Sequence, residues 1–172
     1  MEAQAEKRSL NLRLTDARKS PIPDIVGLDG ALAGLGGGIA MALVGWLISL
    51  SSGSDIWQTP KLIAGAIGGS STVAPGFEAG PVLLGTIMHF AFSMIMGALF
   101  GIVFRRALHL PSSFGLPIVG GLIYGLALWF IAYFMVLPAL NSGLLSVYAP
   151  AFIIQNLTYG IVLGIIYTYL RP

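Results

Sequence analysis

The sequence contains no cysteine and few charged residues. Without cysteine the chain has no disulfide, no thiolate nucleophile and no sulfur ligand for zinc or an iron–sulfur cluster. Charged residues make up 9% of the chain, whereas ordinary globular domains carry about 25%. Hydrophobic residues reach 56%, and the mean hydropathy is +0.86. Such a chain cannot hide its apolar surface in one water-soluble core, so we expect an integral membrane protein.

Catalytic and nucleotide-binding patterns are also missing. The sequence shows no Ser-His-Asp set, phosphate-binding loop or metal-ligand spacing, and the three glycines at positions 36–38 lie inside an apolar run. The net charge of +2 comes mostly from segments outside the apolar runs, so it reports topology rather than nucleic-acid binding. We therefore expect no enzyme, no metal site and no nucleic-acid partner.

Four apolar runs are long enough to cross a bilayer as helices, which takes about 20 residues. They cover residues 31–50, 81–104, 117–137 and 150–170, the third ending at a Leu137–Pro138 stop. The expected fold class is all-α, a four-helix transmembrane domain over residues 30–172. Residues 61–69 are apolar but too short to span, which predicts an interfacial or re-entrant helix. Asp55 and Glu78 fall in the outer loop, where we expect them to be solvated.

Residues 1–29 form a polar arm that lacks the apolar core of a signal peptide, so we expect no cleaved leader. Within it, SLNLRL alternates like a short strand and SPIPD breaks any helix. The arm is either a flexible tail or a segment docked on a partner, and we expect docking. Eight of the nine Lys and Arg residues lie in the arm, at Arg105–Arg106 or at Arg171, and Lys61 lies opposite. The positive-inside rule then predicts that both termini are cytoplasmic.

The two halves of the membrane domain resemble each other. GGIAMALVGWLI (37–48) aligns with GGLIYGLALWFI (120–131) and places Trp46 on Trp129. HFAFSMIMGALF (89–100) aligns with NLTYGIVLGIIY (156–167) and places Gly97 on Gly164. Each half would be one helical hairpin that enters from the same side. The alignment predicts two parallel repeats related by a pseudo-twofold axis along the membrane normal.

Every predicted span carries two glycines four residues apart. Such pairs let two helix backbones approach closely, and close packing drives helix association in lipid. We expect the glycines mainly to hold the bundle together; a further oligomer or partner interface is the alternative. The pairs are Gly34 and Gly38, Gly97 and Gly101, Gly121 and Gly125, and Gly160 and Gly164.

His89 is the only histidine inside a predicted span, and ionisable groups in spans often mark functional sites. Its imidazole can ligate a haem iron or a chlorophyll magnesium, relay a proton, or hydrogen-bond a neighbouring helix. No second membrane histidine exists for a bis-histidine haem site. We interpret His89 as a structural residue and keep cofactor binding and solute handling as alternatives. The other predicted buried polar residues are Gln155, Asn156 and Thr158, which can pair with His89 or form a solute site.

The pattern resembles an uncharacterised family of small four-helix bacterial membrane proteins. The likeness rests on HFAFSMIMG in the second span, GLIYGLALW followed by VLP in the third, and NLTYGIVLG in the fourth. It covers about residues 31–170. Family members often carry histidine at the position of Asn156, so this chain departs from a paired-histidine pattern. The resemblance implies the fold and a bacterial cytoplasmic membrane, and it implies no particular activity.

Three functional hypotheses follow from these patterns. The first is a non-catalytic, accessory or structural subunit of a larger membrane complex, with other membrane subunits and lipids as its partners. The second is a small carrier or channel for an ion or small solute, since interfaces between repeats often hold transport sites. The third is a pigment- or haem-associated subunit that uses His89. We expect bound lipid and no other cofactor.

Overall fold

Four long helices make up most of the structure. The computed structural model describes residues 4, 22–23, 25–68, 74–109, 115–140, 143–146 and 149–171. Its long helices are α2 (Leu28–Ser51), α4 (Ala79–Ile102), α5 (Leu116–Ile131) and α7 (Ala149–Leu170). With the turns that extend α4 and α5, four segments of 22 to 29 residues are long and apolar enough to cross a membrane. The expected all-α, four-helix membrane fold is confirmed, and the described ranges contain no strand.

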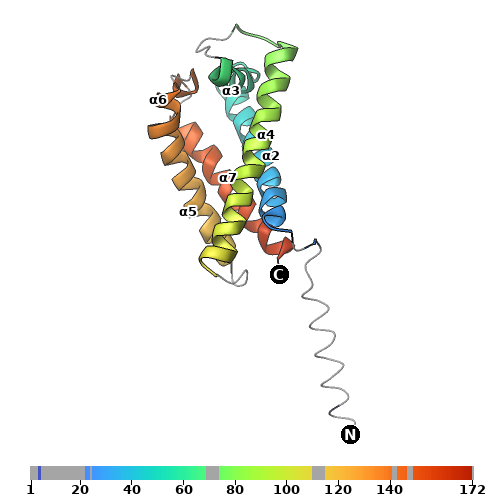
Figure 1. The fold of residues 1–172 in the computed structure, drawn as a ribbon. Coiled ribbons are helices and arrows are strands. Elements are labelled where there is room, and N and C mark those ends of the chain that lie inside the picture. Colours follow the sequence, from blue (N-terminus) through green and yellow to red (C-terminus); the bar gives the residue numbers. More distant parts are fainter. Residues whose placement is uncertain are drawn as a thin grey trace.

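The helices run alternately in opposite directions between the two ends of the bundle (Figure 1). At one end, here called the terminal end, α2 and α5 begin and α4 and α7 finish. The opposite end, here called the cap end, carries the short helix α3 (Gln58–Gly68) and the 3₁₀ turn η3 (Gly143–Ser146), which contact each other. The chain therefore enters the bundle and leaves it at the terminal end.

Helices α2 and α7 form the centre of the bundle. Helix α2 packs against α4 and α7, and α7 also packs against α5. Helices α4 and α5 meet mainly through side chains, one of which is Tyr124, whose hydroxyl donates to the Met96 carbonyl at 2.8 Å. The buried core lies in the half nearer the terminal end and contains Ala33, Phe100, Phe104, Tyr159, Leu163 and Tyr167. The Tyr167 ring meets the rings of Phe100 and Phe104 edge to face, at 5.6 and 5.9 Å, an arrangement that aromatic quadrupoles favour.

The observed helix ends differ from the predicted ones where the chain uses unusual turns. Helix α2 begins at Leu28, before the predicted start, and α4 continues into a π turn, η1 (Val103–Ala107). The third span continues past the predicted stop through the π turn η2 (Ala132–Val136) into α6 (Leu137–Ala139). Proline cannot donate a backbone hydrogen bond and its ring crowds the preceding turn, so a wider turn before Pro138 lets the helix go on.

The predicted short helix forms, and it begins earlier than expected, at Gln58. Helix α3 packs along α4 at the cap end and is not among the four candidate spans. Gly69, the predicted strand-like SLNLRL and most of the polar arm lie outside the described residues.

Candidate functional site

The predicted glycines of α2 and α4 lie where these two helices cross. A Cβ added to Gly97 would come within 2.6 Å of the Gly34 Cα, closer than any ordinary contact. Gly38 lies against Ser93 in the same way, and Gly101 faces the first turn of α2. Because only hydrogen fits at these positions, the two backbones touch directly.

The second hairpin, α5 and α7, crosses in the same manner. Gly121 and Gly125 pack on Gly160, and Gly164 packs on the backbone of Pro117 and Ile118. All eight predicted glycines are buried at helix crossings within the chain.

A further close glycine contact, at Gly85, was not predicted from the sequence. A Cβ on Gly85 of α4 would overlap the carbonyl group of Pro60, so Gly85 is the point where α3 rests on α4. Gly85 has no glycine four residues away, and the pair pattern therefore did not indicate it.

His89 forms a hydrogen bond to the backbone of α2. Its Nε2 atom lies 3.0 Å from the carbonyl oxygen of Gly38, and the side chain is partly buried. A carbonyl only accepts, so Nε2 carries the proton and a neutral ring keeps Nδ1 as an acceptor. The bond joins α2 and α4 one turn from their glycine contact. The prediction of haem or pigment binding at His89 stays a prediction.

The other predicted polar residues lie near one another on α7 and bond in different ways. The Asn156 side chain is buried and donates a hydrogen bond to the Phe152 carbonyl at 2.8 Å. Its hydrogen bond is therefore made within its own helix and not with His89. Thr158 differs from the expectation of burial: it is partly exposed, and its hydroxyl donates to the Ile154 carbonyl. Gln155 is buried, with 7% of its surface exposed, and has no hydrogen bond among the described residues.

Gln155 and His89 line the same cavity in the half of the bundle nearer the cap end. The cavity has a volume of about 260 Å³ and lies between α2, α3, α4, α7 and η3. Its wall is mostly apolar, and none of the described residues that line it is charged. The aliphatic and aromatic part of the wall includes Ile39, Met41, Leu43, Trp46, Ile63, Phe90, Leu144 and Phe152. Two residues that the sequence singled out separately thus share one space.

A buried ion pair closes the terminal end. The Arg171 Nε donates to Asp29 Oδ2 at 2.8 Å, and Asp29 is only 3% exposed. A second Arg171 nitrogen donates to the Pro23 carbonyl at 3.1 Å, and Arg105 lies 3.9 Å from the same Asp29 oxygen. The ends of α2, α4 and α7 are therefore tied through one carboxylate. Sequence analysis counted Asp29 as part of the polar arm and missed this pairing.

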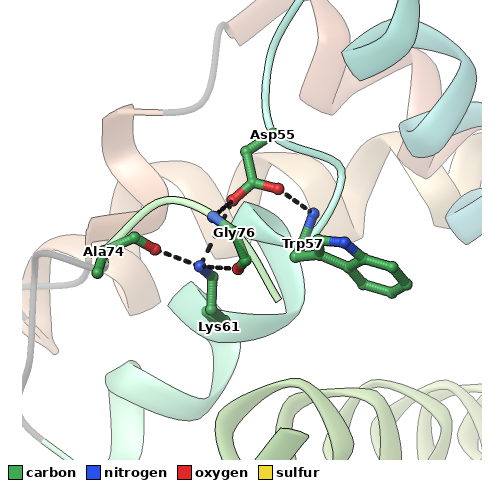
Figure 2. A network of polar contacts seen from close by, with 5 residues as sticks. All are labelled: Asp55, Trp57, Lys61, Ala74 and Gly76. Carbon is green, nitrogen blue, oxygen red and sulfur yellow. Dashed lines mark hydrogen bonds and ion pairs between the residues drawn. The ribbon is translucent and has the colours of Figure 1, made fainter. Parts of the chain in front are cut away.

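At the cap end, Asp55 and Lys61 fix the segment that precedes α4 (Figure 2). Lys61 is 1% exposed; its ammonium group donates to the carbonyls of Ala74 and Gly76 and lies 3.4 Å from Asp55 Oδ2. The Asp55 carboxylate accepts hydrogen bonds from the backbone N–H groups of Trp57 and Gly76, each at 2.9 Å. The expectation that Asp55 is simply solvated is therefore wrong, because this loop folds back onto α3.

These contacts also act on the acidity of Asp55. The hydrogen bond from the Trp57 N–H, with smaller effects from Gly76 and Lys61, holds the pKa of Asp55 below its ordinary value although partial desolvation opposes the shift. Glu78, in the same outer segment, is exposed as expected.

The fold and these sites define a class: the chain is a multi-pass membrane protein built on four apolar helices. A scan against protein-family models and searches of curated proteins and of solved structures find no match. Within the described ranges, no cluster of three or more His, Asp and Glu side chains is arranged to hold a metal ion.

Proposed function

We propose that the chain is a non-catalytic subunit of a larger membrane protein complex in a bacterial cytoplasmic membrane. The observation that carries the proposal is the closed centre of the bundle. Between the cavity and the terminal end, the core of Phe100, Tyr159, Leu163 and their neighbours fills the space between the helices, and the helices touch at glycines. Such direct contact between helices suits a rigid scaffold.

The distribution of charge supports the scaffold over a carrier. Transport of an ion needs polar or charged groups along its path. Among the described residues, Asp29, Arg105, Arg106 and Arg171 lie at the terminal end, and Asp55, Lys61 and Glu78 lie at the cap end. A small carrier of uncharged solute is the second candidate, because the cavity beside His89 provides a starting pocket within the membrane domain.

The outer face of α5 is the surface that we assign to a partner subunit. Helix α5 belongs to the least buried of the four spans, and in the described part of the chain it packs closely on α7 and meets α4 mainly through side chains. Aromatic residues and methionine, which are enriched at protein interfaces, are exposed along α5 and η2. The exposed side chains include Leu122, Ile123, Leu126, Phe130, Phe134 and Met135.

Site-directed photo-crosslinking tests this proposal. A photoreactive amino acid at Phe130 should form an adduct with a stoichiometric partner that also copurifies in mild detergent. The matched control is Leu47, which is similarly exposed but on α2, and it should cross-link only to lipid. A chain that purifies alone or as a homo-oligomer, with no protein adduct from either position, would contradict the subunit role and favour the carrier.

We also propose that both chain termini face the cytoplasm. Arg105, Arg106 and Arg171 gather at the terminal end, which agrees with the positive-inside rule. Since the chain has no cysteine, a single cysteine at Arg106 or at Glu78 can be labelled without background. An impermeant maleimide applied to intact cells should label the cysteine at position 78 and not the one at position 106; the reverse pattern would overturn the orientation.

The duplication of the hairpin is a further part of the proposal. The alignment relates the Gly38–Ser93 contact to the Gly121–Gly160 contact, and both pairs do touch. It likewise relates the contact of Gly34 and Gly97 to that of Pro117 and Gly164. The symmetry is incomplete, because α2 packs closely on α7 while α4 and α5 are bridged by side chains.

A further inference from the structure

Gln155 has an amide group that lacks a partner in a buried place. The residue is only 7% exposed, yet its side chain makes no hydrogen bond to the described part of the chain. Its amide lies over Gly45 of α2, where an added Cβ would stand 3.4 Å from the amide oxygen. A buried amide without a hydrogen bond costs free energy, so such a group in a cavity wall indicates a missing partner.

The cavity next to Gln155 has the composition of a binding site for an uncharged molecule. Small-molecule sites are mostly apolar and carry a few polar groups that orient the ligand. Among the lining residues that the structure describes, the polar ones are Gln155, His89, Thr59 and Thr86, and none is charged. The His89 Nε2 is occupied by Gly38, so the ring offers its second nitrogen, Nδ1. These groups suit a neutral hydroxyl or carbonyl and give no compensation for an ion.

Size and access narrow the class of ligand. A cavity of about 150 Å³ holds a benzene molecule, so about 260 Å³ holds one polar group with the first part of a chain or ring. Three residues of the wall, Ile39, Leu43 and Trp46, are about half exposed on α2. The wall therefore reaches the lipid-facing surface of the bundle, and a molecule dissolved in the bilayer can enter there.

We propose that this cavity binds the polar end of a neutral lipid, whose hydroxyl or carbonyl group hydrogen-bonds the Gln155 amide while its apolar tail leaves past Leu43. The His89 Nδ1 accepts a hydrogen bond from the ligand if its polar group is a hydroxyl, and it forms no hydrogen bond with a carbonyl. The site is independent of the partner surface on α5, since the two lie on different helices.

Quenching of Trp46 fluorescence measures binding, because this residue is part of the cavity wall. The probe is 10-bromo-1-decanol, whose bromine quenches tryptophan, added to the purified protein in which Trp57 and Trp129 are replaced by phenylalanine. The methyl ester of 10-bromodecanoic acid tests a carbonyl in place of the hydroxyl, and 1-bromodecane has neither. We expect saturable quenching by the alcohol or the ester, and binding of 1-bromodecane about tenfold weaker.

Substitutions separate a specific site from general partitioning. Gln155→Met keeps the length of the side chain and removes the amide, so it should weaken binding of the polar probe about tenfold and leave 1-bromodecane unchanged. Thr158→Val, on the same helix but not in the cavity wall, should bind as the parent does. If Gln155→Met does not fold, Ala42→Phe fills the cavity from α2 and should abolish saturation. Quenching that never saturates, or that is equal for all three probes, would overturn the proposal.

Discussion

Replacing Gly97 with alanine should destabilise the bundle, whereas the same replacement at Gly80 should not. Both residues lie in α4. The new Cβ at position 97 would stand 2.6 Å from the Gly34 Cα and overlap the Gly30 carbonyl, but at position 80 nothing beyond the adjacent residues 79 and 81 lies within 4 Å of a Cβ. Carbon atoms prefer separations of about 3.5–4.0 Å, so α2 and α4 would have to move apart by roughly 1 Å.

The sign of the change in the free energy of unfolding distinguishes a packing effect from an effect of helix propensity. Alanine is up to about 1 kcal/mol better than glycine inside a helix, but Pro81 follows position 80 and crowds a Cβ there, so Gly80→Ala should stay close to neutral. Overpacking a tight contact typically costs about 1–3 kcal/mol, so Gly97→Ala should lose about 1–2 kcal/mol after that gain. Gly97→Leu and Gly164→Leu should lose more, because their side chains meet backbone on the opposite helix.

Thermal unfolding in a mild detergent, followed by circular dichroism, measures these differences. The Gly97→Ala protein should unfold at a lower temperature than the parent and the Gly80→Ala protein at about the same temperature. Equal shifts in the same direction for both variants would mean that the crossing does not limit stability, and the packing argument would fail.

Three further predictions concern the polar contacts. Asp29→Asn should cost about 3 kcal/mol, since it removes the carboxylate charge that accepts the Arg171 hydrogen bond at 2.8 Å in a buried place. Arg106→Gln, at an exposed position of the same end, should change stability little, and unfolding curves for the two variants decide this. Because the pKa of Asp55 is lowered in the folded protein, its contacts stabilise the cap end fully above pH about 4 and lose that contribution as the pH falls through the lowered value. Tryptophan fluorescence should therefore report loosening of the cap end only in acid. The Asp55→Asn protein should lack this transition. His89→Asn should fold nearly normally, and the parent protein should show no haem or chlorophyll absorbance; a band in the parent that disappears in the variant would refute the structural role of His89.

The membrane fold could be predicted because it depends on local and periodic features. Each span is an uninterrupted apolar run, and in lipid such a run must be a helix, since every backbone group needs an internal hydrogen bond. The glycine positions are similarly local, because Gly97 and Gly164 stand in regular pairs. The π turn η2 escaped prediction since it depends on how the helix adapts before Pro138, which no hydrophobic pattern records.

The polar sites could not be predicted because their partners are distant in sequence or belong to the backbone. Lys61 bonds carbonyls that come from a loop 13 to 15 residues later, and a sequence does not say where a loop directs its carbonyls. His89 bonds a carbonyl 51 residues away on α2. Predicting the cavity would have required knowing that α3 packs on Gly85, a single glycine that belongs to no repeated pattern. For these sites, the type of side chain identified candidate residues, but their hydrogen-bond partners depend on how the helices and loops pack.

The pairing of Asp29 with Arg171 has a consequence for how the protein is made. The two residues are 142 positions apart, at the start of the first long helix and just after the last one. While the chain is being synthesised, Arg105 after α4 is the first of the two arginines that can approach the Asp29 carboxylate, from which it lies 3.9 Å in the finished fold. The closer hydrogen bond from Arg171 can form only after the last helix has been inserted. The buried contact at the start of the first long helix therefore depends on completion of the last one, and a chain cut short before position 171 cannot form it.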